Sequence, residues 1–246
     1  MATWIAHLRL VENLLPMISE LDHHHFAIGN IAPDSGIPDA KWEKFDPPSE
    51  VTHFRVSGNT YWPTADLEFY RRYLTSINPT GDKERFSFLL GYFFHLVTDN
   101  LWFHHIFRPT KARFAASFAA DPQFIWEVKR DWYGLDFLFV REHPDSIFWR
   151  IFLDCQYTRD YLDFLPQKAI QQNLEHIKAL YQRTDEEIEK RYGERPGIYL
   201  SSTEMDGFIS YAAQRLFDAY QCVWESKADT SGFASVLEFS LGENSS

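Results

Sequence analysis

The stretch from Phe86 to Phe107 constrains the fold of this chain more than any other part of the sequence. It reads FSFLLGYFFHLVTDNLWFHHIF, which is too apolar for a helix on the surface of a protein. On a helix, side chains four residues apart share a face, so we expect His95 and Asp99 to lie about 6 Å from each other. A buried imidazole and a buried carboxylate need polar partners. They either hydrogen-bond to each other or bind a metal ion together.

The spacing of apolar residues predicts an all-α fold, a single-domain multi-helix bundle. The 246 residues are enough for one large core. Apolar residues recur at three- and four-residue steps, which predicts helices over residues 3–21, 64–77, 83–106, 122–142, 146–162, 167–192 and 202–226. Residues 22–63 are rich in glycine and proline and are expected to form a long, irregular, functional segment. We expect the helical domain to span residues 1–227, and residues 228–246 to form a partly disordered C-terminal tail.

Composition and charge narrow the function. The net charge of −11 argues against stable nucleic-acid binding, which depends on cations that neutralise phosphates. A small phosphate substrate remains compatible, because bound divalent ions supply positive charge locally. No apolar run approaches the roughly 20 residues that span a membrane. His7 and Arg9 interrupt the N-terminal apolar sequence, which lacks the basic start of a signal peptide. We therefore expect a cytoplasmic protein; its oligomeric state is not predicted.

Eight side chains are candidate metal ligands: His7, Asp34, His53, His95, Asp99, His105, Glu127 and Asp131. Glu127 and Asp131 repeat the four-residue spacing on a second predicted helix, and paired ligands on facing helices can build a multi-metal site. His105 is preferred to His104, because it lies about 80° around the helix from His95, whereas His104 lies about 180° away. Ten residues of straight helix span about 15 Å. The helix must therefore bend or end between Asp99 and His105, or His105 must bind a different ion.

The order of these residues resembles the zinc-dependent phospholipase C family, which shares its all-helical fold with single-strand-specific zinc nucleases. The resemblance covers about residues 3–136 and rests on His7, Gly29-Asn-Ile-Ala-Pro-Asp34, Thr52-His53-Phe54, and His95-x-x-x-Asp99 followed by His105. It implies a cluster of up to three zinc ions that hydrolyses phosphodiester bonds. In such a site, two close ions activate a water molecule, so no serine or cysteine nucleophile is required.

The resemblance also implies a role for each ligand. Asp34, His53 and His95 hold one ion, and Asp34 bridges to a second ion that His105 and a pair of ligands four residues apart also bind. The third ion is held by His7, Asp99 and the N-terminal amine. Asp34 is in addition the candidate catalytic residue, which orients the attacking water or takes its proton.

The chain departs from the family pattern at two places. Where the family has His-x-x-x-Glu or His-x-x-x-Asp, this sequence has Glu127-x-x-x-Asp131, with Asp136 as an alternative ligand. The second ion is then expected to bind less tightly or to be a harder metal than zinc. The chain also begins with Met1, and only removal of Met1 leaves the Ala2 amine to bind the third ion.

The leading hypothesis is a zinc-dependent hydrolase, similar to phospholipase C, that acts on a small phosphodiester or a phospholipid. The absence of a basic amphipathic helix puts phospholipid specificity in doubt. Two alternatives stay open. The first is a phosphodiesterase of nucleotides or single-stranded nucleic acid. The second is a non-catalytic relative that retains the fold.

Overall fold

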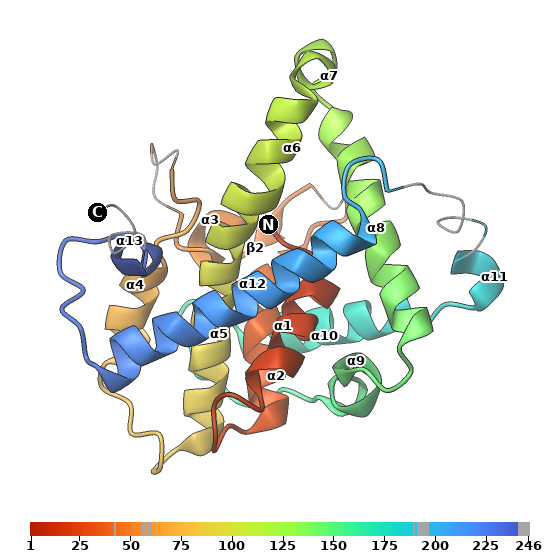
Figure 1. Cartoon of the computed structure of the whole chain (residues 1–246). Coiled ribbons are helices and arrows are strands. Elements are labelled where there is room, and N and C mark those ends of the chain that lie inside the picture. The colour runs from red at the N-terminus through yellow and green to blue at the C-terminus, as the bar shows by residue number, and fades with distance from the viewer. Residues whose placement is uncertain (42, 56–57, 59–60, 189, 191–196, 241–246) are drawn as a thin grey trace.

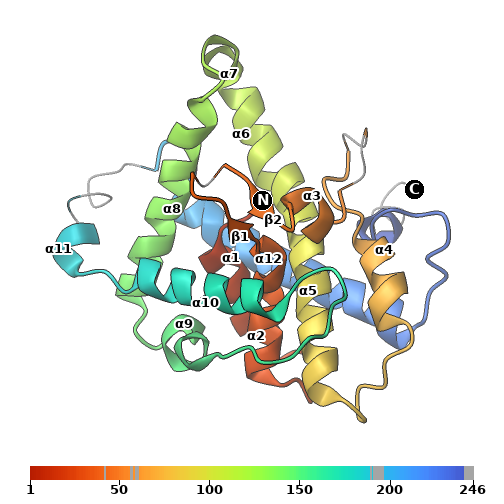
Figure 2. The same ribbon diagram turned by 180° about the vertical axis from the view of Figure 1, so that it is seen from behind.

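The computed structural model describes residues 1–41, 43–55, 58, 61–188, 190 and 197–240. These residues form an all-α fold, which confirms the predicted class, with one antiparallel pair of two-residue strands among them. Helix α5 (Lys83–Trp102) runs through the centre. Helix α12 (Ser202–Tyr220) crosses it on the side seen in Figure 1, and α10 (Gln167–Tyr181) covers the side seen in Figure 2.

Helix α5 is the buried helix that the apolar stretch predicts. Asp82 caps its N-terminus by accepting a hydrogen bond from the backbone N–H of Arg85, and all residues from Phe86 to Trp102 are buried. The regular α-helix ends at Trp102, inside the interval in which we expected a bend or an end. The chain continues through a π-helical turn, η3 (Phe103–Phe107), into α6 (Arg108–Arg113).

Helix α2 (His23–Ile31) corrects the expectation that residues 22–63 form one irregular segment. Asp22 caps it by accepting a hydrogen bond from the backbone N–H of His25. It packs closely on α5 because two glycines face each other's helix. A Cβ atom on Gly29 would lie 2.1 Å from the Phe88 carbonyl oxygen, and one on Gly91 would lie 2.5 Å from the Phe26 carbonyl oxygen.

The chain between α2 and α4 (Asp66–Phe69) contains further short elements. These are the 3₁₀ turn η1 (Ala32–Asp34), the strands β1 (Ile37–Pro38) and β2 (Phe45–Asp46), and α3 (Ser49–Thr52). The strands pair antiparallel with Ile37 opposite Asp46. The sequence did not predict this pair, because two residues are too few to show an alternating pattern.

The other elements pack around this core. They are α1 (Trp4–Leu14), η2 (Tyr70–Leu74), α7 (Ala115–Ala120), α8 (Phe124–Glu142), α9 (Ile147–Arg150), η4 (Phe152–Asp154), α11 (Asp185–Ile188), η6 (Gln221–Glu225) and α13 (Leu237–Ser240). Several predicted helices are shorter than expected. The one over 3–21 ends at Leu14. The one over 146–162 is reduced to α9 and η4, and the one over 167–192 ends at Tyr181, before α11; part of its end lies outside the described residues. Helices α6 and α8 converge toward α7, which connects them (Figures 1 and 2).

The segment after η6 folds back onto α4. The Asp66 carboxylate accepts hydrogen bonds from the backbone N–H of Val236 and the side-chain amide of Asn100, both at 2.8 Å. Arg71 donates to the Thr230 carbonyl oxygen at 3.0 Å. Residues 241–246 lie outside the described part of the chain, so the division into a domain and a tail stays a prediction. Among the described helices, none combines the length and apolarity needed to cross a membrane.

Candidate metal centre

The close packing of α2 on α5 orients His95. Its Nδ1 lies 2.8 Å from the backbone carbonyl oxygen of Asn30, which accepts a hydrogen bond only if Nδ1 carries the proton. The neutral ring therefore has its lone pair on Nε2. This is the arrangement in which a histidine binds metal, with one nitrogen held by a carbonyl group and the other available.

His53 lies at the C-terminal end of α3 and points at the same place. Its Nδ1 is 3.1 Å from the Ser49 carbonyl oxygen, which favours the same tautomer as in His95. Its Nε2 lies 3.3 Å from the Nε2 of His95 and 3.2 Å from Oδ1 of Asp34, at the end of η1. Tyr92 of α5 holds α3 in place by donating a hydrogen bond to the Thr52 carbonyl oxygen at 2.5 Å.

These three ligand atoms fit a zinc ion. Zinc binds nitrogen and oxygen at about 2.0–2.1 Å in tetrahedral geometry, which separates neighbouring ligand atoms by about 3.3 Å. The separations here are 3.3 Å between the two imidazole nitrogens, 3.2 Å from His53 to Asp34, and 4.0 Å from His95 to Asp34. Without a cation, two nitrogen lone pairs and a carboxylate oxygen would repel one another. The donor set therefore suits a divalent ion.

A second group lies beside the first, on the other side of His95. The His7 ring of α1 stacks on the His95 ring with 3.9 Å between centroids, and its Nε2 lies 3.8 Å from Oδ1 of Asp99. Both ring nitrogens of His7 and Oδ2 of Asp99 are buried and have no hydrogen-bond partner among the described residues. Unsatisfied polar atoms at this depth cost free energy, so these atoms also suit a bound cation.

The N-terminal segment reaches this second group. The Ala2 nitrogen lies 2.8 Å from Oδ1 of Asp99 and donates a hydrogen bond to it as a backbone N–H. Thr3 is the N-cap of α1, and its hydroxyl also donates to Asp136 at 2.6 Å. Asp136 accepts a second hydrogen bond from Tyr181 at 2.7 Å. Asp136 thus anchors the N-terminal segment through Thr3. Both of its carboxylate oxygens accept hydrogen bonds here, which differs from the alternative role of Asp136 as a ligand of the second ion. Binding of metal by the Ala2 amine stays a prediction.

The electrostatics of the cluster favour metal binding. Burial lowers the pKa values of His7 and His95, so both rings are neutral at pH 7. Burial acts to raise the pKa of Asp34, but the neighbouring His95 and His53 lower it to about 2. Neutral imidazoles and an ionised carboxylate are the protonation states that bind a cation.

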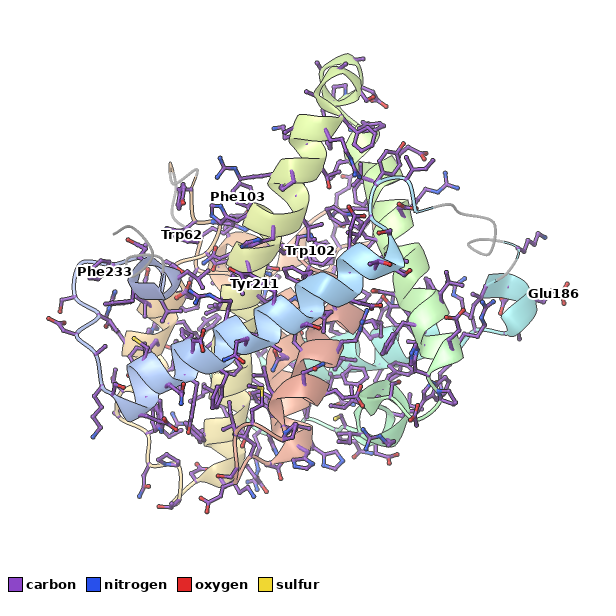
Figure 3. The ribbon with its side chains drawn as sticks, in the orientation of Figure 1. Trp62, Trp102, Phe103, Glu186, Tyr211 and Phe233 are labelled. Carbon is purple, nitrogen blue, oxygen red and sulfur yellow. The ribbon has the colours of Figure 1, made fainter. Side chains whose placement is uncertain are left out.

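Three of the predicted ligands lie elsewhere. His105, on η3, is exposed and packs its ring 4.6 Å from that of Tyr211, where α12 crosses the end of α5 (Figure 3). Glu127 is exposed and pairs with Arg130 at 3.1 Å. Asp131 is buried and accepts hydrogen bonds from the backbone N–H groups of Tyr199 and Leu200. The structure therefore does not bring these three side chains to Asp34.

The register of α8 explains why Glu127 and Asp131 lie away from the cluster. Residues two apart on a helix point about 200° away from each other. Lys129, Trp132 and Tyr133 line the cavity above the cluster, which turns Glu127 and Asp131 away from it. The sequence analysis missed Lys129, although its spacing of three, four and seven residues from Trp132, Tyr133 and Asp136 marks one helix face.

The cluster lies at the base of a cavity of about 740 Å³. Asp34 and His53 line this cavity together with Lys129, and its other walls include the apolar side chains Trp4, Ile37, Phe45 and Trp132. Figure 2 shows the elements around it: the N-terminus, the β1–β2 pair, α3, α8 and α10. The site is therefore accessible to a small ligand that has both an anionic and an apolar part.

The chain thus combines an all-α fold with a buried histidine–aspartate cluster that could hold a metal ion beneath a cavity. A family model described as zinc-dependent phospholipase C matches residues 6–136, more than half of the chain. The chain belongs to this family. The match contains all eight predicted ligands. No curated protein and no solved structure gives a significant match to the chain.

Proposed function

We propose that this protein is a zinc-dependent hydrolase of phosphodiester bonds. The observation that carries the proposal is the convergence of His53, His95 and Asp34 at the base of the cavity, with 3.2–4.0 Å between their ligand atoms. Membership of a zinc-dependent phospholipase C family supports the metal and the class of reaction. We place a further ion at His7 and Asp99, where the sequence analysis placed the third ion. We assign no ion to His105, Glu127 or Asp131.

Each part of the site has a function in this proposal. A zinc ion, when bound, acts as a Lewis acid toward a phosphoryl oxygen and lowers the pKa of a water molecule. The Asp34 carboxylate, 11% exposed and at the junction of cluster and cavity, orients the attacking water or accepts its proton. The rings of His95 and His53 are oriented by the carbonyl groups of Asn30 and Ser49. The apolar walls accommodate the ester substituents and exclude bulk water.

The substrate that we favour is a small phosphodiester. The family points to a phospholipid as that phosphodiester. The rival is a nucleotide or a single-stranded nucleic acid. The net charge of −11 disfavours a long polyanion, and the apolar cavity walls favour a ligand with an apolar substituent.

Side-by-side assays test the proposal. The zinc-loaded protein is given a short-chain choline phospholipid and a dinucleotide, and release of each product is measured. We expect turnover of the phospholipid, a reduction of at least about 100-fold in Asp34→Asn, and little turnover of the dinucleotide. Preferred turnover of the dinucleotide supports the rival. An activity that Asp34→Asn leaves unchanged contradicts the assigned site and supports a non-catalytic relative.

A further inference from the structure

Lys129 is a cationic residue at the entrance to the candidate metal centre. It lies on α8 and lines the same cavity as Asp34 and His53. Among the described lysine and arginine residues, it is the one that lines this cavity. Its ammonium lies 4.8 Å from the centre of the Trp126 ring, and the described residues offer it no carboxylate within ion-pair distance. Arg130, one residue later, instead pairs with Glu127 at 3.1 Å and is exposed.

The surroundings of Lys129 indicate a role in ligand binding and not in stabilising the fold. Its side chain is partly buried, and this burial lowers the pKa of Lys129, whereas the charges of Asp34 and Asp99 act to raise it. A partly buried ammonium without an ion-pair partner loses hydration and gains little in return. When the two carboxylates bind cations, their attraction for Lys129 is largely neutralised. The ammonium is then available to an anion that enters the cavity.

We infer that Lys129 binds the phosphate group of the ligand beside the metal cluster. The inference rests on the proposed function and extends it. The ligand is a phosphate ester whose anionic oxygens contact Lys129 and whose apolar substituent lies against Ile37, Phe45 and Trp132. The family pattern predicts that α8 presents metal ligands to the cluster. The register of α8 turns Glu127 and Asp131 away from the cavity and places Lys129 there instead. A fixed positive side-chain charge thus takes the place of part of the metal charge.

The geometry of α8 supports a role in orientation. Trp132 and Tyr133 follow Lys129 by three and four residues, on the same face, and both line the cavity. Asp136 continues this face and is held by Thr3 and Tyr181. Lys129 is therefore mounted on a rigid helix that contacts the N-terminal segment of the cluster. A cation held in this way positions an anion more precisely than one on a loop.

Phosphate binding tests the inference independently of turnover. Inorganic phosphate is titrated into the zinc-loaded full-length protein by calorimetry, and zinc content and circular dichroism are measured on each variant. Lys129→Met and Lys129→Gln remove the charge, Lys129→Arg retains it, and Arg130→Met is the matched control. We expect both neutral variants to bind phosphate at least about tenfold more weakly with unchanged zinc content. Lys129→Arg and Arg130→Met should remain within about twofold of the wild type.

Three outcomes separate the two proposals. If the wild type does not bind phosphate, or if both neutral variants bind it within twofold of the wild type, the inference about Lys129 is overturned. If Arg130→Met weakens binding as much as Lys129→Met, the effect is one of general surface charge, and the inference is again overturned. If phosphate binding depends on Lys129 but no phosphodiester is hydrolysed, the proposed function fails and the phosphate site stands.

Discussion

The Nε2 atoms of His53 and His95 lie 3.3 Å apart, and the opposite nitrogen of each ring faces a backbone carbonyl oxygen. Two imidazoles in this tautomer direct lone pairs at each other, which is unfavourable unless a cation lies between them. The fold holds this arrangement because the Asn30 carbonyl oxygen of α2 fixes the His95 ring of α5, and the C-terminal end of α3 carries His53. The relationship between these two residues is therefore the strongest structural argument for a metal centre.

Close packing at Gly91 should be essential for stability. A Cβ atom there would lie 2.5 Å from the Phe26 carbonyl oxygen, so Gly91→Ala forces α2 and α5 apart and displaces the Asn30 carbonyl that holds His95. We expect a loss of about 1–3 kcal/mol in the free energy of unfolding, measured in urea.

Gly207→Ala is the matched control, because Gly207 lies on α12 and, apart from its own helix backbone, no described residue comes within 4 Å of the added Cβ. Helix propensity predicts that this variant gains roughly 0.5–1 kcal/mol. Equal stability changes in the two variants would contradict the account of how α2 packs on α5.

The buried Asp66 should make stability decrease as pH rises. Burial raises its pKa to about 7, from an ordinary value of 3.8, although Ser235, Val236 and Asn100 oppose the shift through hydrogen bonds. The folded state therefore retains a proton that the unfolded state has lost above pH 4. This contribution is complete below pH 3.8 and is lost as pH rises toward 7.

Urea unfolding of wild type and Asp66→Asn, both in chelator, checks this contribution. Between pH 5.0 and 6.5 we expect the wild type to lose about 2 kcal/mol relative to the variant. The comparison between the two proteins cancels the titration of the other groups. A difference that stays constant across this interval would contradict the raised pKa of Asp66.

Asp131 should stabilise the fold without binding metal. It accepts hydrogen bonds from the backbone N–H groups of Tyr199 and Leu200 at 2.8 and 3.1 Å, so it holds the chain before α12. We expect Asp131→Ala to cost about 2 kcal/mol of stability and to leave the zinc content unchanged. Glu127→Ala, at an exposed position, should change stability by less than about 0.5 kcal/mol. Loss of one zinc equivalent in either variant would restore both residues as ligands.

Much of the core was predictable from local sequence patterns. The apolar stretch predicted the buried helix α5, and the spacing of His95 and Asp99 predicted neighbours on one face. Their ligand atoms are 3.8 Å apart. The helix predicted over residues 202–226 begins at Ser202, where Ser201 and Glu204 form a capping box. These features depend on residues within one or two helical turns, which a single sequence shows directly.

The rest depends on long-range contacts. Helix α2 was missed because glycine in its sequence, at Gly29, reads as a loop signal, whereas its function is to allow contact with α5. The register of α8 was also missed. Glu127 and Asp131 share a four-residue spacing, but spacing alone does not show which face of a helix points inward. The structure shows that the face of α8 that carries Lys129 points into the cavity.

The zinc content of the protein tests the central claim most directly. Wild type, His95→Ala and His104→Ala are purified without chelator, and zinc per chain is measured by mass spectrometry. His104 is the control because its Nε2 lies 3.0 Å from the Tyr61 carbonyl oxygen, outside both ligand groups. We predict at least one equivalent in wild type and His104→Ala, and a loss of at least one equivalent in His95→Ala. Less than one equivalent in the wild type, or no loss in His95→Ala, would contradict the metal centre.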